Sequence, residues 1–118
     1  MSSSLRERLS AGLTPAMKAR DRVAVAALRS ALAAVSNAEA VPVDTVPRAG
    51  AVEDAAVGAG AADAPRRELS EDDVRAVVVV EVDERVRAAA EMAGHGRLED
   101  AQRLTAEADV LRRVLFSD

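Results

Sequence analysis

Apolar residues recur at helical spacing along most of the chain, and the segment Asp21 to Glu39 shows the pattern best. There, branched apolar residues and alanines each return every three or four positions, as on an α-helix with one wide apolar face. The branched residues are Val25, Leu28, Leu32 and Val35, and the alanines are Ala24, Ala27, Ala31, Ala34 and Ala38. A face this wide is typical of a helix in the middle of a bundle, where alanines allow close approach. Asp21 is well placed to cap its N-terminus.

An earlier helix is predicted from about Leu5 to Ala19. Ser4 and Glu7 have the spacing of a capping box, in which each residue's side chain accepts from the other's backbone amide. Four apolar residues follow at spacing four, namely Leu5, Leu9, Leu13 and Met17. Pro15 lies inside this segment and removes one backbone hydrogen bond, so we expect a kink there rather than two helices.

A third helix is predicted from Ser70 to Ala93. Ser70 and Asp73 again have capping-box spacing, and acidic residues favour the positive end of the helix dipole. The run Val77 to Val80 would suit a strand, but the start signal and the helix-forming residues after it favour a helix. Gly94 is then expected to take the left-handed position that ends it.

The last predicted helix runs from about Arg97 to Leu115. Its apolar residues alternate at three and four, which is the narrow seam of a coiled coil. These are Ala101, Leu104, Ala108, Leu111 and Leu115. Because only a short glycine-containing turn precedes it, the last two helices should pair as an antiparallel hairpin.

Residues 40–68 lack any periodic apolar face and hold three of the four prolines. They are predicted to form a long flexible loop, either a tolerated insertion or a functional lid. The expected fold is therefore all-α: one four-helix domain made of two helical hairpins, residues 1–39 and 69–118, joined by this loop.

Composition and charge narrow the range of possible functions. The chain has no cysteine, one histidine and one aromatic residue, which excludes disulfides, thiolate or multi-histidine metal sites and base-stacking platforms. The sequence shows no membrane span or signal peptide, so a cytoplasmic location is expected. The net charge is −4, but residues 1–39 hold six basic and three acidic side chains. Three of the cations, Lys18, Arg20 and Arg22, cluster where the first hairpin should turn.

No residue pattern points to catalysis or to a cofactor. His95 stands between two glycines without a nucleophile nearby, which favours an exposed turn residue. Glu81 and Arg85 are four residues apart, so they either form a structural ion pair or contact a partner. Arg29 flanks the apolar face of its helix and either pairs with Glu81 or Glu84 or contacts a partner. Asn37 either helps to end that helix or contacts a partner.

The segment KARDRVAVAALRSALAAVSNAE, together with the helix before it, resembles the YqeY-like family, which is related to the tail of the GatB component of glutamine-dependent tRNA amidotransferase. Arg29 and Asn37 stand where the family pattern has them. The second half resembles the family in its LS-acid start, Glu81, Arg85, the Gly96-Arg97 turn and the terminal AE-x-x-VL. The resemblance covers the first helical subdomain of the family; the second subdomain is not present in this sequence. Val79 and Val80 also depart from it, since these positions are polar in the family.

The resemblance implies a noncatalytic helical module that assists tRNA or amidotransferase subunits. The activity named for the family setting is carbon–nitrogen ligation with glutamine as amide donor. The candidate tRNA contacts are Lys18, Arg20 and Arg22, and the candidate partner or ion-pair residues are Arg29, Asn37, Glu81 and Arg85. The alternative function is a self-associating interaction module without an RNA role. Neither function requires a metal or cofactor.

Overall fold

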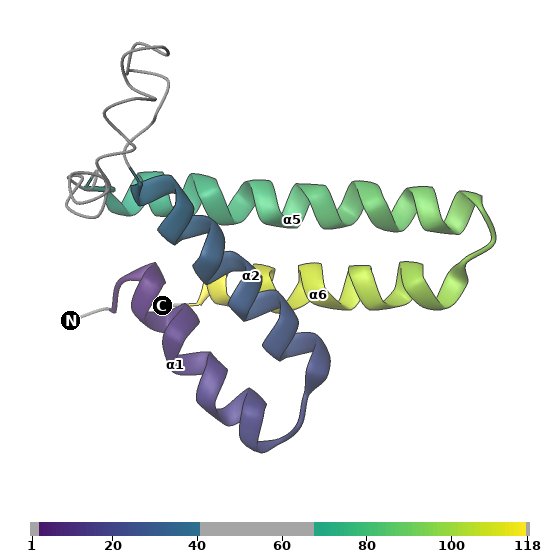
Figure 1. Cartoon of the computed structure of the whole chain (residues 1–118), viewed down its shortest axis with the longest axis horizontal. Coiled ribbons are helices and arrows are strands. Elements are labelled where there is room, and N and C mark those ends of the chain that lie inside the picture. The colour runs from purple at the N-terminus through teal and green to yellow at the C-terminus, as the bar shows by residue number, and fades with distance from the viewer. Residues whose placement is uncertain (1–2, 41–67, 118) are drawn as a thin grey trace, which may run out of the picture.

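A computed structural model describes residues 3–40 and 68–117, and these residues form four α-helices (Figure 1). The helices are α1 (Leu5–Lys18), α2 (Arg22–Glu39), α5 (Glu71–Gly94) and α6 (Leu98–Phe116). α1 pairs with α2 and α5 pairs with α6, so the predicted all-α fold of two helical hairpins is confirmed. Most of the predicted loop, residues 41–67, lies outside the described residues.

The predicted caps are present at the helix starts. In α1, Glu7 N donates to Ser4 Oγ at 3.1 Å, and Ser4 N donates to Glu7 Oε1 at 2.8 Å. Ala24 N donates to the Asp21 carboxylate at 3.0 Å at the start of α2. α1 continues through Pro15 as one helix rather than two. The kink expected at Pro15 stays a prediction.

The start of α5 stabilises two helices at once. Ser70 and Asp73 form the predicted capping box, with bonds of 3.0 and 3.1 Å. Glu71 reaches further than predicted, because its Oε2 accepts from Leu5 N of α1 at 2.8 Å. One acidic residue of this turn therefore also satisfies a free amide at the start of the other hairpin.

The valine run is helical, as the start signal predicted. Val78 is fully buried in α5, whereas Val79 and Val80 are exposed. Four consecutive valines in a helix point in four directions, so only part of the run enters the core. The helix then continues to Gly94, for a total length of 24 residues.

The glycine that ends α5 is not the predicted one. Gly94 is the last helical residue, and the left-handed residue is Gly96, with φ of 77°. Gly96 N donates to Ala93 O at 3.0 Å and Arg97 N donates to Met92 O at 2.8 Å. These two bonds are those of a Schellman motif, which needs its left-handed residue two positions after the last helical one.

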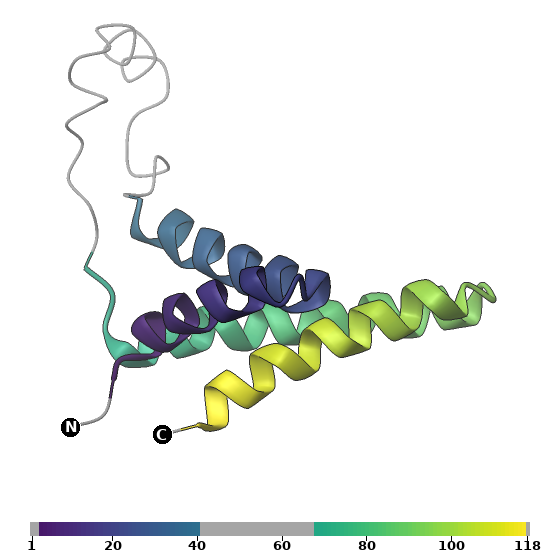
Figure 2. The same ribbon diagram turned by 90° about the horizontal axis from the view of Figure 1, so that it is seen from below.

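α2 lies at the centre of the packing, as its wide apolar face predicted. It contacts α1, α5 and α6, and it crosses over the antiparallel α5–α6 pair (Figure 1). Ala27 and Ala31 are completely buried there, with Leu28 and Val35 almost so. Viewed from the side, α1 and α2 lie against one end of the longer hairpin (Figure 2). The core therefore lies where the two hairpins cross.

The other end of the α5–α6 hairpin extends beyond α1 and α2 (Figures 1 and 2). Consequently the predicted seam of α6 is buried at Ala108, Leu111 and Leu115, but only half-buried at Ala101 and Leu104. No helix in the described ranges is long and apolar enough to cross a membrane.

The buried alanine positions of α2 should not accept larger side chains. We expect Ala31→Leu to destabilise the protein by about 1–3 kcal/mol, because it forces extra methylenes into a closed packing. Ala33→Leu, on the exposed side of the same helix, is the matched control and should change stability by less than about 0.5 kcal/mol. Urea unfolding followed by circular dichroism measures both; equal effects would show that α2 is not closely packed.

Candidate functional site

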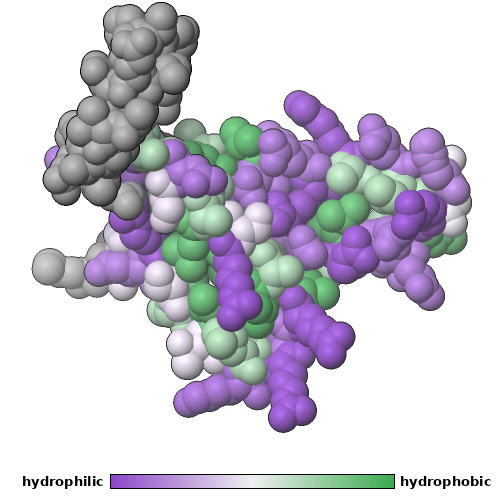
Figure 3. All heavy atoms as spheres, viewed as in Figure 1, coloured by the Kyte–Doolittle hydropathy of each residue, from purple (hydrophilic) through white to green (hydrophobic). Residues whose placement is uncertain are grey.

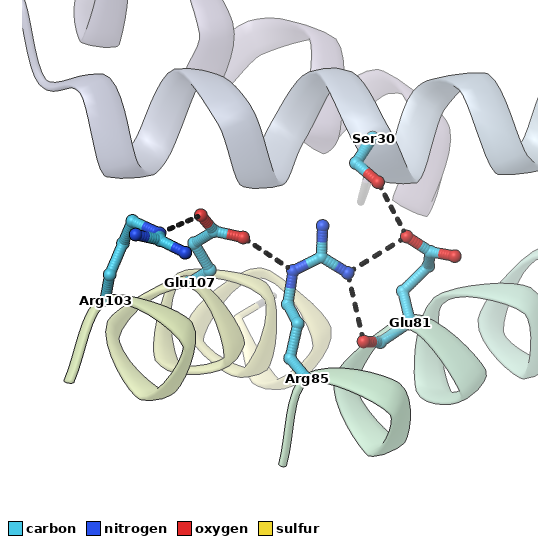
Figure 4. A network of polar contacts seen from close by, with 5 residues as sticks. All are labelled: Ser30, Glu81, Arg85, Arg103 and Glu107. Atoms are coloured by element: carbon cyan, nitrogen blue, oxygen red, sulfur yellow. Dashed lines mark hydrogen bonds and ion pairs between the residues drawn. The ribbon is translucent and has the colours of Figure 1, made fainter. Parts of the chain in front are cut away.

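Five of the seven candidate residues gather in two places on the fold. Glu81 and Arg85 lie between α5, α6 and α2, in a cluster completed by Ser30, Arg103 and Glu107 (Figure 4). Lys18, Arg20 and Arg22 lie together at the turn between α1 and α2. We call the first the ion-pair cluster and the second the basic turn.

Arg85 is the centre of the ion-pair cluster. Its Nε donates to Glu107 Oε1 of α6 at 2.9 Å, and its Nη1 donates to Glu81 Oε1 at 3.0 Å. The same Nη1 also donates to the Glu81 main-chain carbonyl at 3.1 Å. The Glu81–Arg85 ion pair, one of the two alternatives that the spacing left open, is thus present, and it extends across the hairpin to a second glutamate.

α2 joins the cluster through Ser30. Its Oγ donates to Glu81 Oε1 at 2.8 Å, so the same carboxylate oxygen accepts from α2 and from Arg85 (Figure 4). Arg103 Nε lies 3.9 Å from the other oxygen of Glu107. One set of contacts therefore fixes the relative positions of three helices.

The centre of the cluster is nearly closed to solvent, whereas the Arg103 side chain at its edge is half-exposed. The Arg85, Glu81 and Glu107 side chains are 12%, 14% and 11% exposed. Charges at such burial are stable only when paired. Because a guanidinium neutralises each carboxylate, the arrangement is suited to holding helices in register rather than to proton transfer.

The basic turn is exposed and short. Lys18 is the last residue of α1 and Arg22 is the first residue of α2. Within residues 3–40 and 68–117, no ion pair involves Lys18, Arg20 or Arg22. The carboxylate between them, Asp21, is used to cap α2. Hydrophilic side chains project from this end of the molecule in Figure 3.

Arg20 has an unusual backbone conformation. Its φ is 56°, and it is the one described residue other than glycine with positive φ. Arg20 N donates to Met17 O at 3.1 Å and Asp21 N donates to Ala16 O at 2.9 Å, the bonds of a second Schellman motif. Glycine is the usual residue at this position, and a side chain there costs about 1 kcal/mol.

Arg29 and Asn37 lie apart from the ion-pair cluster. Arg29 is exposed, and its Nη2 donates to Met17 Sδ at 3.9 Å. Its suggested ion pair with Glu81 or Glu84 is wrong: among the described residues Arg29 pairs with neither, and Glu81 bonds to Ser30 and Arg85 instead. Arg29 instead extends the cationic surface of the first hairpin. Asn37 is exposed in the last turn of α2, where its carbonyl accepts from Ala40 N at 3.2 Å.

Further titratable groups lie around the turn between α5 and α6. His95 is exposed at the end of α5. In the described ranges, no three histidine, cysteine or acidic side chains are grouped to hold a metal. At the start of α6, a hydrogen bond from Arg103 and the nearby Arg97 lower the pKa of Asp100 from its ordinary value of 3.8. These contacts stabilise the start of the helix.

Three members of the ion-pair cluster were not predicted from the sequence. Glu107 is 8% exposed when the whole residue is counted. Its position in the sequence could have indicated this burial, since it lies three residues after Leu104 and four before Leu111. An acidic residue beside an apolar seam indicates a buried partner. Ser30 offered no such signal, because a serine on a helix flank is ordinarily solvated.

The chain was compared with protein-family models, with curated protein sequences and with solved structures, and none of the three comparisons finds a match.

The burial and pairing of the ion-pair cluster allow a quantitative prediction about stability. Arg85→Ala should lower the free energy of unfolding by roughly 3 kcal/mol, because it leaves the nearly buried Glu81 carboxylate without a cation and Glu107 with only the more distant Arg103. Arg112→Ala breaks the half-exposed pair with Asp109 and should cost less than about 1 kcal/mol.

A triple replacement separates pairing from packing. Glu81→Leu, Arg85→Met and Glu107→Leu together should be within about 1 kcal/mol of the wild type, because apolar residues of similar volume need no partner. Denaturant unfolding measures all three proteins. A small loss in Arg85→Ala would mean that solvent already screens the cluster.

Proposed function

We propose that this chain is a noncatalytic helical module that contacts tRNA through the basic turn, in the setting of glutamine-dependent tRNA amidotransferase. The observation that carries the proposal is the convergence of three exposed cations, without acidic partners among the described residues, on one short turn. Such a turn suits phosphate oxygens, which fix position without reading sequence. The resemblance to the YqeY-like family supplies the setting, and with it a cytoplasmic location.

The conformation of Arg20 supports this role. A glycine would close the same turn without strain, so the side chain at this position costs stability. Residues held in unfavourable backbone conformations concentrate at functional sites. A guanidinium that projects from the turn and binds phosphate would account for the strain.

The distribution of charge also favours this end of the molecule. Residues 1–39 have a net positive charge, whereas the second hairpin is acidic. A polyanion would therefore be attracted to the α1–α2 turn and repelled from α5 and α6. Arg29, beside Met17, adds a fourth cation to the attractive side.

The ion-pair cluster gives a structural role to other residues that match the family pattern. Glu81, Arg85 and Glu107 match the family pattern, and here they bond to one another. They are architectural residues in this chain, so the surface for a partner lies elsewhere. This favours the basic turn over Glu81 and Arg85 as the contact.

The test is a titration of labelled tRNA at low and moderate salt. With about three phosphate contacts, the affinity should be low, and log K should fall with log salt at a slope of roughly −2 to −3. Reversing Lys18, Arg20 and Arg22 to Glu should abolish binding while leaving helicity unchanged.

A charge-matched control separates position from net charge. Reversing Arg87, Arg97 and Arg112, which lie on the second hairpin, changes the net charge equally and should leave most of the binding. If both triple variants bind alike, or the wild type does not bind at low salt, the proposal is wrong.

Arg20→Gly gives a second, sharper variant. It should keep or raise stability by up to about 1 kcal/mol, because it removes backbone strain. It should also weaken tRNA binding and reduce the salt slope by about one phosphate contact. Unchanged binding would show that the Arg20 side chain does not contact RNA.

A second candidate function is a self-associating module without an RNA role. Exposed apolar side chains on the second hairpin favour it, among them Val79, Val80, Val86, Leu98 and Phe116.

A further inference from the structure

α6 carries a second seam, on the side away from the core. Its members are Leu98, Gln102, Thr105, Asp109, Arg112 and Phe116, and we call them the outer stripe. All are exposed except Asp109, which is half-buried, and Leu98 and Phe116 are 61% and 80% exposed. Their spacings alternate between four and three, as in a coiled-coil seam. Leu98 and Phe116 are about five full helical turns apart, so the stripe is straight.

A shallow hollow lies along the Leu98 end of the outer stripe. It has a volume of about 350 Å³, and most of its surface is apolar. Its lining residues are Leu98, Ala101, Gln102, Thr105, Ala106 and Asp109. All of its lining residues belong to α6, so no other described helix contributes to it.

The outer stripe is complementary to itself in the antiparallel direction. Its spacing of four, three, four, three and four reads identically from either end. A second α6 laid antiparallel would therefore match every position in register. Leu98 would meet the second copy's Phe116, Gln102 would meet its Arg112, and Thr105 would meet its Asp109. The contacts are apolar at the two ends and polar in the middle.

The charges beside the stripe match in the same register. Glu99 lies in the first turn of α6 and Arg113 in the last turn, both exposed. In the antiparallel arrangement each Glu99 faces the second copy's Arg113. The two helix dipoles also attract each other, because the positive end of each helix lies beside the negative end of the other. Ala106 then lies at the two-fold axis, where its small side chain allows close approach. An isologous interface requires this kind of self-complementarity.

We propose that a second copy of this chain docks antiparallel along the outer stripe, with each Phe116 packed against the Leu98 end of its partner. The inference develops the second candidate function, and it requires no RNA. The exposed valines of α5 are less suitable, because Asp83 interrupts Val79 and Val86 and would be buried without a partner. Since one helix face is a small interface, the dissociation constant should be in the range of ~10–100 μM.

Cysteine pairing tests the register, because the chain has no cysteine of its own. Gln102→Cys and Arg112→Cys, mixed under mild oxidation, should form a mixed disulfide. Each alone should not, because equivalent positions in the two copies would be about 15 Å apart along the helix. Ala90→Cys on α5, mixed with Gln102→Cys, is the exposed control. Self-linking of Gln102→Cys, or equal linking by the control, would overturn the antiparallel stripe.

Charge reversal tests the same arrangement without a covalent bond. Sedimentation equilibrium should show association that Glu99→Arg or Arg113→Glu weakens about tenfold, since each reversal places like charges opposite one another twice. The double variant should recover the wild-type affinity, because the pairs are restored with opposite signs. Circular dichroism checks that all variants fold.

The outcomes separate this inference from the tRNA proposal. A chain that remains monomeric at ~1 mM, well above the expected range, or a double variant that does not recover, would overturn the dimer. Neither result changes the tRNA titration, which is measured at low protein concentration on the other hairpin.

Discussion

The structure depends on the close approach of α2 to the α5–α6 hairpin. Ala27 and Ala31 are fully buried where the helices cross, and a methyl group is all that either presents. A larger side chain would hold the helices further apart and open the core beneath them. The same approach brings Ser30 within hydrogen-bonding distance of Glu81. The core packing and the Ser30–Glu81 bond between the hairpins therefore both depend on this small-residue face.

The ion-pair cluster adds specificity to that packing. Apolar faces made of alanine, valine and leucine can slide or rotate at little cost, since many of their contacts are interchangeable. Arg85 does not allow such sliding, because its side chain must pair with Glu81 on its own helix and with Glu107 on the next one. A change of register would leave nearly buried charges unpaired. We regard the cluster as the feature that selects one arrangement of three helices, more than as a source of net stability.

The two surfaces proposed for binding lie on different hairpins and have different physical character. The basic turn is cationic and held in place by a strained Schellman motif, so it suits a ligand recognised by charge. The outer stripe of α6 is mixed in polarity and self-complementary, so it suits another helix. Because neither surface contributes to the core, either can be altered while the fold is kept. The ion-pair cluster belongs to the architecture.

Local signals in the sequence determined the helices. Ser4, Asp21 and Ser70 mark three starts, and the spacing of apolar residues gives the helical face even across the four valines. These features depend on neighbours within one or two turns, which the sequence contains directly. Tertiary structure decided what depends on contacts between distant segments. Glu71 caps α1 as well as its own helix, and Arg85 bonds to Glu107. One local choice was also left open by the sequence, since both Gly94 and Gly96 suit the end of α5 and only the complete turn shows that Gly96 is the left-handed residue. The periodicity of apolar residues predicts the apolar face of a helix. The helices that pack against this face decide which polar residues at its edge are buried.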